Sequence, residues 1–258
     1  MPEQMTLHGQ ERAEREVAQA RRELAEIKAH HELGGQGGVL RASIFGINDG
    51  LVSNFSLVVG VAAADPGRHI ILLAGVAGLV AGAFSMAAGE YISMKVQREV
   101  FEAAIDLERH KLEGSPEGER KEVEVIYRAQ GIPRPDAERL AERVMADPEI
   151  ALDLMARQEL GLDPDNLGSP QGAAIGSFLS FGAGAVLPLL PFIFLAAGQA
   201  LPAALLVCGL ALFAVGAATA RLSRRPILLG GLRMLLIGAA AAAVTYGVGR
   251  LLGVSVSA

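Results

Sequence analysis

Five runs of apolar residues, each long enough to cross a lipid bilayer as a helix, set the pattern of this chain. A crossing needs about 20 mostly apolar residues. The runs cover approximately residues 40–64, 69–95, 172–197, 201–221 and 226–252. Pro188 and Pro191 fall near the far end of the third run, where they are expected to kink the helix. The pattern therefore predicts five membrane-spanning helices.

Polar positions dominate between the second and third runs. Apolar residues first continue at helical spacing to about Leu112, which predicts one long helix that leaves the membrane and continues into water. Three short helices are expected next, over residues 117–130, 135–145 and 148–160, because Gly and Pro interrupt the pattern between them. The predicted fold class is an all-α membrane protein: five transmembrane helices with a three- to four-helix acidic cytosolic insert between spans two and three.

The chain begins with a different kind of helix. Residues 10–32 are rich in charge and carry only a narrow apolar stripe, which is typical of a surface or docking helix. A Gly-rich link follows at residues 34–38. Four parts are therefore expected, and they are the charged amino-terminal helix with its link (1–38), transmembrane helices one and two (39–95), a metal-binding helical insert (96–170) and transmembrane helices three to five (171–258).

Charge is segregated along the 258 residues. Residues 169–258 hold five arginines and no acidic residue, whereas residues 95–168 hold 11 Lys and Arg against 18 Asp and Glu. Basic residues flank the spans mainly on the side of the amino terminus and the insert, which predicts that both are cytosolic. The acidic insert also argues against binding to nucleic acid.

Several chemistries are excluded by what the sequence lacks. No HExxH, GxxxxGK[ST], GxSxG or GxGxxG motif occurs, so nothing supports hydrolase or nucleotide chemistry. Cys208 is the only cysteine and lies in an apolar run, so one chain can form neither a disulfide framework nor a Cys-based zinc site. Residues 1–38 lack the apolar core of a signal peptide.

Two acidic residues lie inside the apolar runs, Asp49 in the first and Glu90 in the second. A carboxylate at such depth costs roughly 2.5–3.5 kcal/mol on insertion scales, so it is expected to serve a cation or proton site. The alternative for Asp49 is a structural acid that caps a broken helix at Asn48 to Gly50. Glu90 lies nearer the cytosolic boundary, where a structural role is easier to accept. No Lys or Arg deep in a span is expected to neutralise either residue.

Met86 lies one helical turn before Glu90, so the two share a helix face. A thioether beside carboxylates suits a softer divalent ion, such as ferrous iron, better than magnesium or calcium. A methionine in a membrane helix most often serves packing alone, so this residue counts only together with the acids.

The insert carries a second set of candidate ligands, from several helices. Carboxylates that face one another from different helices bind iron and manganese in other helical proteins, although acidic helix faces are more often simply solvated. The candidates are Glu102, Asp106, Glu108 and Glu113 on the extended helix, Glu119 and Glu122 at i, i+3 on the next, and Met155 and Glu159 at i, i+4 on the last.

These segments, taken in order, resemble the vacuolar iron transporter family. FGINDGLVS at residues 45–53 resembles its first-span signature, and SMAAGEYIS at residues 85–93, with Gln97, resembles its second-span signature. IYRAQG at residues 126–131 and ELGL at residues 159–162 resemble its cytosolic insert. The resemblance covers roughly residues 39–252.

The resemblance implies a dimeric, five-helix, proton-coupled exporter of ferrous iron and related divalent ions. It implies that Asp49 and Met86 line the path. It further implies that the insert gathers metal through glutamates, and these are matched here by Glu108, Glu119, Glu122 and Glu159, with Met155. Two positions depart from the family pattern, since Lys111 stands where another glutamate is usual and Ala156 where a second methionine occurs. Glu102 or Glu113 could then complete the ligand set.

The leading hypothesis is a metal/proton antiporter that exports ferrous iron, and also manganese, from the cytosol through Asp49, Met86 and Glu90. It needs no prosthetic group, because the divalent metal (Fe2+, Mn2+ or Zn2+) is both substrate and insert ligand. Its expected partners are protons, the lipid bilayer and a second copy of the chain. The expected location is a bacterial inner (plasma) membrane, or the vacuolar membrane in a eukaryote.

Two rival functions use the insert differently. A membrane-tethered ferroxidase would need Glu-x-x-His motifs from paired helices, whereas Glu108 is followed by His110, one residue too early. A metal sensor anchored by its spans would bind metal without transport, but a mere anchor would not require Asp49.

Overall fold

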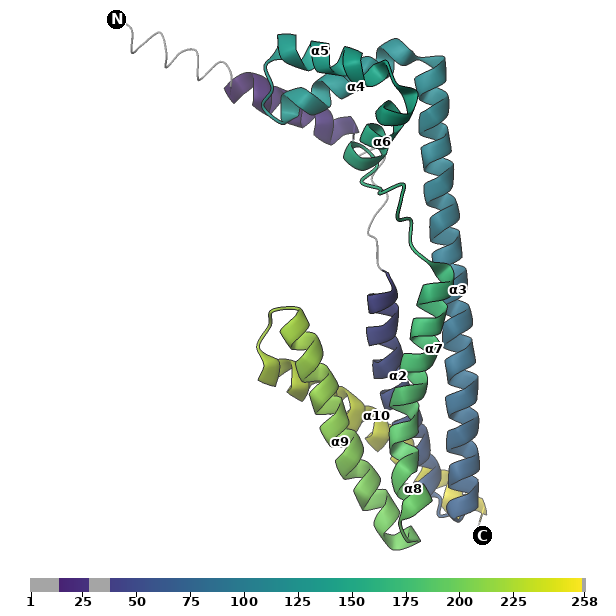
Figure 1. Cartoon of the computed structure of the whole chain (residues 1–258). Coiled ribbons are helices and arrows are strands. Elements are labelled where there is room, and N and C mark those ends of the chain that lie inside the picture. The colour runs from purple at the N-terminus through teal and green to yellow at the C-terminus, as the bar shows by residue number, and fades with distance from the viewer. Residues whose placement is uncertain (1–13, 28–37, 257–258) are drawn as a thin grey trace, which may run out of the picture. The chain divides into compact units, whose positions relative to one another are not determined.

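A computed structural model describes residues 14–27 and 38–256, and every regular element within them is a helix (Figure 1). Five of these helices are long and apolar enough to cross a membrane, which confirms the all-α fold with five spans. The chain divides into two compact units. The membrane unit comprises the described residues of 37–95 and 169–258, and the insert unit comprises those of 1–36 and 96–168.

The spans begin and end within a few residues of the apolar runs. The helices of the membrane unit are α2 (Val39–Ala63), the first part of α3 (Arg68–Gly114), α7 (Pro170–Val186), α8 (Leu190–Phe194), α9 (Ala197–Leu222) and α10 (Ile227–Val256). The third span is interrupted where its prolines predicted a kink. A 3-10 turn, Leu187–Leu189, contains Pro188 and separates α7 from α8, which contains Pro191, because proline has no N–H to continue the α-helical ladder.

Helix α2 lies at the centre of the membrane unit, beside α7, α9 and α10 (Figure 1). Small residues let its backbone approach α7 closely. A Cβ atom added to Gly184 would lie 2.5 Å from the Ile47 carbonyl oxygen, and one added to Gly50 would overlap the Phe181 carbonyl. On the other side, Thr245 of α10 donates a hydrogen bond of 2.7 Å to the Ser56 carbonyl.

The membrane part of α3 packs through few positions. Ala83 joins a cluster with Phe181 and Ala185 of α7, and Met94 joins one with Ala42 and Ala173. Only 17% of its most apolar 18-residue segment is buried, so this helix presents a long apolar face to its surroundings.

The insert unit contains the last part of α3 and three shorter helices, α4 (Pro116–Ala129), α5 (Arg134–Met145) and α6 (Pro148–Gln158). Proline in the first turn of each shorter helix matches the fixed φ that a helix start requires. Asp147 caps α6 by accepting hydrogen bonds from the backbone N–H groups of Glu149 and Ile150. Two clusters form the core, one around Val123, Ile126, Ala141 and Met155, the other around Phe101, Ala156, Leu160 and Leu162.

A helix over residues 14–27 packs against α4 within the same unit. Arg21 donates a hydrogen bond of 3.1 Å to the carbonyl of Ala129, the last residue of α4. Arg128 lies 3.9 Å from Glu23, and Leu24 packs on the first core cluster. The expected docking helix therefore contacts the insert, while the rest of the predicted range 10–32 and nearly all of the Gly-rich link lie outside the described residues.

Candidate metal-binding sites

A cavity of about 350 Å3 lies between α2, α3 and α7, and both Asp49 and Met86 line it. Helix α2 also contributes Ser53 and Asn54, and α3 contributes Ser85. Carboxylate, amide and hydroxyl oxygens thus share one cavity with a thioether sulfur. This donor set can coordinate a divalent transition metal.

Asp49 does not cap a helix break, because α2 is continuous from Val39 to Ala63. Its side chain is exposed, and no described lysine or arginine forms an ion pair with it. The nearby Ser53 hydroxyl donates to the Asp49 backbone carbonyl at 2.5 Å, so this bond does not engage the carboxylate. The carboxylate is therefore available for a metal ion or a proton.

Asn54 has its amide oriented by the backbone of α7. Its Nδ2 donates a hydrogen bond of 2.6 Å to the Ala185 carbonyl, and this bond distinguishes the nitrogen from the oxygen of the amide. The residue is 2% exposed, and its Oδ1 has no hydrogen-bond donor among the described residues. A buried oxygen without a partner normally costs free energy, so a cation in the cavity would provide the missing contact.

Two glycines of α3 shape the cavity wall. A Cβ added to Gly78 would lie 2.5 Å from Leu57 Cδ2 and 2.9 Å from Asn54 Oδ1. A Cβ added to Gly82 would overlap the ring of Phe181, which is 3% exposed and cannot move freely. Larger residues at either position would therefore fill the cavity or displace its wall.

Glu90 has a different environment from the one expected. It is 9% exposed, and its Oε2 lies 3.4 Å from Nη2 of Arg41, in the first turn of α2. Arg41 stands at the end of its span and not deep inside it, yet its long side chain reaches Glu90 on the neighbouring helix. Within the described residues, Glu90 is not part of the lining of the cavity that contains Asp49.

The insert unit brings three glutamates together from three places in the sequence. Glu108 of α3, Glu119 of α4 and Glu159, just after α6, each offer a carboxylate oxygen within 4.8 Å of the others. Their exposed fractions are 1%, 5% and 1%. We call these three residues the carboxylate cluster. Glu122 borders it, with a buried Oε2 that has no described donor.

Lys111 lies in contact with the carboxylate cluster. Its Nζ lies 3.0 Å from Glu108 Oε2 and 3.7 Å from Glu159 Oε1. Burial lowers the pKa of Lys111, but its hydrogen bond to Glu108 and its attraction to the nearby carboxylates outweigh burial, so the pKa lies above its usual value. The cluster therefore already contains one positive charge from the protein itself.

Burial and mutual repulsion hold protons on this cluster near neutral pH. Burial, followed by repulsion from Glu122 and Glu108, raises the pKa of Glu119 to about 8. Burial, followed by repulsion from Glu108, raises the pKa of Glu159 to about 7. Any metal that binds here must therefore compete with protons.

The end of α6 places Glu159 in the cluster. Gly161 adopts a left-handed φ of 67°, which glycine tolerates without strain, and Leu162 N–H donates to the Ala156 carbonyl at 2.9 Å. The chain therefore turns sharply soon after Glu159.

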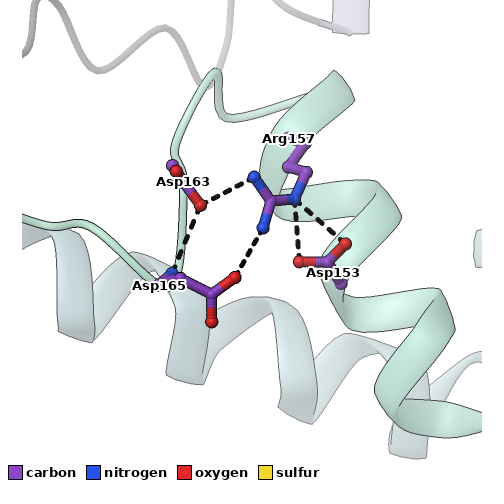
Figure 2. A network of polar contacts seen from close by, with 4 residues as sticks. All are labelled: Asp153, Arg157, Asp163 and Asp165. Atoms are coloured by element: carbon purple, nitrogen blue, oxygen red, sulfur yellow. Dashed lines mark hydrogen bonds and ion pairs between the residues drawn. The ribbon is translucent and has the colours of Figure 1, made fainter.

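A network around Arg157 holds the next segment (Figure 2). Figure 2 shows its guanidinium between three carboxylates. The Nε atom lies 2.9 Å from Asp153, Nη1 2.6 Å from Asp163 and Nη2 2.9 Å from Asp165. The first aspartate belongs to α6 and the other two to the following loop. Arg157 thus fastens this loop to the helix that precedes Glu159.

The remaining predicted insert ligands lie elsewhere in the unit. Glu102, whose side chain is 45% exposed, pairs with Arg98 at 2.7 Å, and Glu113 is exposed near the end of α3. Met155 is fully buried in the first core cluster, with Val123 and Ile126. These positions place Glu102 and Glu113 outside the carboxylate cluster and give Met155 a packing role.

Three residues that the sequence did not single out are central to these sites: Asn54, Arg41 and Lys111 as an ion-pair partner. Asn54 could have been recognised in the sequence, because an asparagine among apolar residues is expected to be buried and a buried amide must find partners. In the sequence, Arg41 indicates only a basic residue at the end of a span, and Lys111 only a departure from the family pattern.

Comparison with known proteins shows which sequences most of the chain resembles. The profile of the VIT family matches residues 40–250. The chain is 34% identical over 225 residues to a protein of Acanthamoeba castellanii named "Vacuolar iron transporter", covering 85% of this chain and 81% of the relative. It is 38% identical over 215 residues to "Vacuolar iron transporter homolog 1" of Oryza sativa subsp. japonica, covering 83% and 74%. A "Vacuolar iron transporter" of Centaurea cyanus is 30% identical over 224 residues, covering 86% and 91%.

Proposed function

Since the chain belongs to the VIT family, we propose that it exports ferrous iron and manganese from the cytosol in exchange for protons. Members of this family are transporters, so the chain transports metal ions across a membrane and is not an enzyme. The ferroxidase alternative is therefore set aside. The particular metals, the coupling to protons and the direction are what we propose.

The observation that carries the proposal is the cavity shared by Asp49 and Met86. One carboxylate can hold a proton or contribute to a metal site, but protonation removes the charge that attracts the metal. A proton arriving from the far side would thus displace the metal and regenerate the site. The thioether favours softer ions, and Asn54 Oδ1 would supply a neutral oxygen ligand.

Glu90 would act at the cytosolic end of this path. It lies one helical turn after Met86 on α3, and Arg41 pairs with it. An incoming divalent ion would compete with the guanidinium for this carboxylate. Arg41 would therefore limit how strongly Glu90 retains the ion before it reaches Asp49.

The insert unit would collect metal on the cytosolic side. Glu108, Glu119 and Glu159, with Glu122 beside them, offer buried carboxylate oxygens of the kind that bind iron and manganese. Glu102, Glu113 and Met155 would contribute less, since Glu102 pairs with Arg98, Glu113 is exposed and Met155 packs in the core.

Two features support the proposed setting. Basic residues at the ends of the spans favour a cytosolic amino terminus and insert. The exposed apolar face of α3, which carries Leu73, Val80 and Phe84, suits a helix contact with a second copy of the chain. The relatives are named as vacuolar proteins. For this chain we propose a membrane that has the insert unit on its cytosolic side.

A flux assay in proteoliposomes tests the proposal. Purified chain is reconstituted with an imposed pH gradient, and uptake of Fe2+, Mn2+ and Zn2+ is followed with and without the gradient. Wild-type uptake should require the gradient, Asp49→Ala should abolish it, and Met86→Leu should shift the preference from Fe2+ toward Mn2+. Ser223→Ala, whose hydroxyl bonds only to its own helix, serves as a matched control.

Two outcomes would contradict it. Uptake at the wild-type rate by liposomes that contain the Asp49→Ala variant would exclude Asp49 as the exchange site. Metal binding by the chain with no flux under any gradient would favour the metal sensor.

A further inference from the structure

Lys111 places a positive charge where the carboxylate cluster would hold a metal. Its Nζ approaches Glu108 and Glu159, which are two of the three glutamates whose oxygens lie within 4.8 Å of one another. The contact with Glu108 lies within α3 at i, i+3, whereas the contact with Glu159 joins α3 to the segment after α6 and so depends on the folded unit.

We propose that the Lys111 ammonium is a tethered cation that occupies the metal position of the carboxylate cluster, and that a divalent metal binds by displacing it. This inference rests on the proposed role of the insert in collecting metal. It adds that the chain carries its own competitor for the site.

The carboxylate cluster and Glu122 offer more oxygen ligands than the Lys111 ammonium can contact. Glu108 Oε1, Glu119 Oε2 and Glu122 Oε2 are buried without a hydrogen-bond donor among the described residues. One ammonium carries one charge and three donors, and it already contacts Glu108 Oε2 and Glu159 Oε1, so it cannot also satisfy these three oxygens. A divalent ion takes several oxygen ligands at once and would neutralise more of the cluster.

Lys111 also has a route out of the cluster. Its side chain is 28% exposed, whereas those of Glu108 and Glu159 are 1% and 0% exposed. A lysine ammonium is strongly hydrated and sits on a flexible stem, so it can move to solvent while the glutamates stay in place.

The tethered cation would weaken metal binding and speed release. A metal must first break the contacts of Lys111, and the returning ammonium helps to expel it. The insert would then load only when cytosolic metal is abundant and would pass the metal on quickly. Such behaviour suits a collecting site better than a storage site.

Titration of the full chain in detergent with Mn2+, which is stable in air, tests this inference. Lys111→Ala should bind Mn2+ at least tenfold more tightly than wild type, while Lys111→Arg should stay within about threefold, because it keeps the charge. Lys121→Ala, which removes an exposed lysine of α4, should leave the affinity unchanged. Equal or weaker binding by Lys111→Ala would overturn the proposal.

A second measurement needs no variant. Acylation of lysines by a water-soluble amine reagent, read by mass spectrometry, should increase at Lys111 when Mn2+ is added and stay constant at Lys121. No change at Lys111 would overturn the proposal even if the variants fold poorly.

The Glu108→Gln variant distinguishes failure of this inference from failure of the proposed function. Loss of Mn2+ binding in Glu108→Gln with no gain in Lys111→Ala would refute only the tethered cation. Undiminished binding in Glu108→Gln would instead refute the cluster as the metal-collecting site, and the tethered cation with it.

Discussion

Arg41 Nη2 lies 3.4 Å from Glu90 Oε2, so an ion pair joins the first turn of α2 to α3. The arginine side chain is 57% exposed and the glutamate side chain 10%, so the pair is only partly shielded from solvent. Its expected strength is that of a surface pair, at most about 1 kcal/mol.

Removal of the arginine charge should therefore alter metal entry by a limited factor. Arg41→Gln should lower the KM for Fe2+ about threefold to fivefold, because Glu90 can then bind the metal without competition, and Glu90→Gln should raise it. Initial rates of proteoliposome uptake measure both. Arg98→Gln, which removes an exposed intrahelical partner of Glu102, is the charge-matched control and should change neither.

The contact between Gly82 and Phe181 predicts a paired substitution effect. Gly82→Ala should destabilise the chain by about 1–3 kcal/mol and reduce uptake, because the new methyl group overlaps the buried ring. Phe181→Leu in the same chain should restore part of both. The measurements are thermal unfolding followed by circular dichroism and the initial rate of uptake.

Gly89→Ala provides the control on the same helix, since an added Cβ there meets no atom within 4 Å. That change should be neutral or stabilise the helix by up to about 1 kcal/mol. Equal loss of stability in both alanine variants would show that helix packing at Gly82 is not the cause.

Asn54 should contribute both to stability and to transport. Asn54→Ala removes the donor to the Ala185 carbonyl and the amide oxygen of the cavity, so a loss of about 1–3 kcal/mol is expected together with a higher KM. Asn54→Asp places a carboxylate against that carbonyl and should fold less well still. Unchanged KM in a folded Asn54→Ala chain would restrict the residue to a packing role.

The raised pKa values of Glu119 and Glu159 predict a pH dependence of the metal-free protein. Both folded values, about 8 and about 7, lie above the ordinary 4.5, so the folded state binds more protons between pH 4.5 and 8. Stability conferred by these groups is thus present at pH 5 and is lost as the pH rises toward 8. The unfolding transition of the insert unit, followed in chelator, should move to lower temperature over this range.

Glu119→Gln should flatten that dependence, because the amide keeps the size of the side chain and does not ionise. Saturating Mn2+ should reverse its sign, since metal binding favours the deprotonated carboxylates. A wild-type transition that rises between pH 5 and pH 8 in chelator would contradict the assigned pKa shifts.

The membrane helices could be predicted from the sequence because bilayer thickness sets their length. Each apolar run has the length of about 20 residues that a bilayer crossing needs. Pro188 and Pro191 interrupt the third helix because proline has no N–H for the helical hydrogen bonds. The short insert helices were equally predictable, since proline lies in the first turn of each one.

The sites were only partly predictable, because their contacts join distant positions. Asp49, Met86 and the three clustered glutamates could be selected by residue type and spacing. The pairing of Arg41 with Glu90 spans 49 positions and depends on the reach of one side chain. The orientation of Asn54 depends on a carbonyl 131 positions away, which no local pattern encodes.

Cys208, the only thiol of the chain, is fully buried between α2, α9 and α10. Maleimide probes in water should therefore leave the folded wild-type chain unmodified. A cysteine introduced at Ser53 or Ser85 would then be the single reactive position, without prior removal of a native one. The natural sequence is thus a ready background for following, residue by residue, when the cavity around Asp49 opens to each side of the membrane.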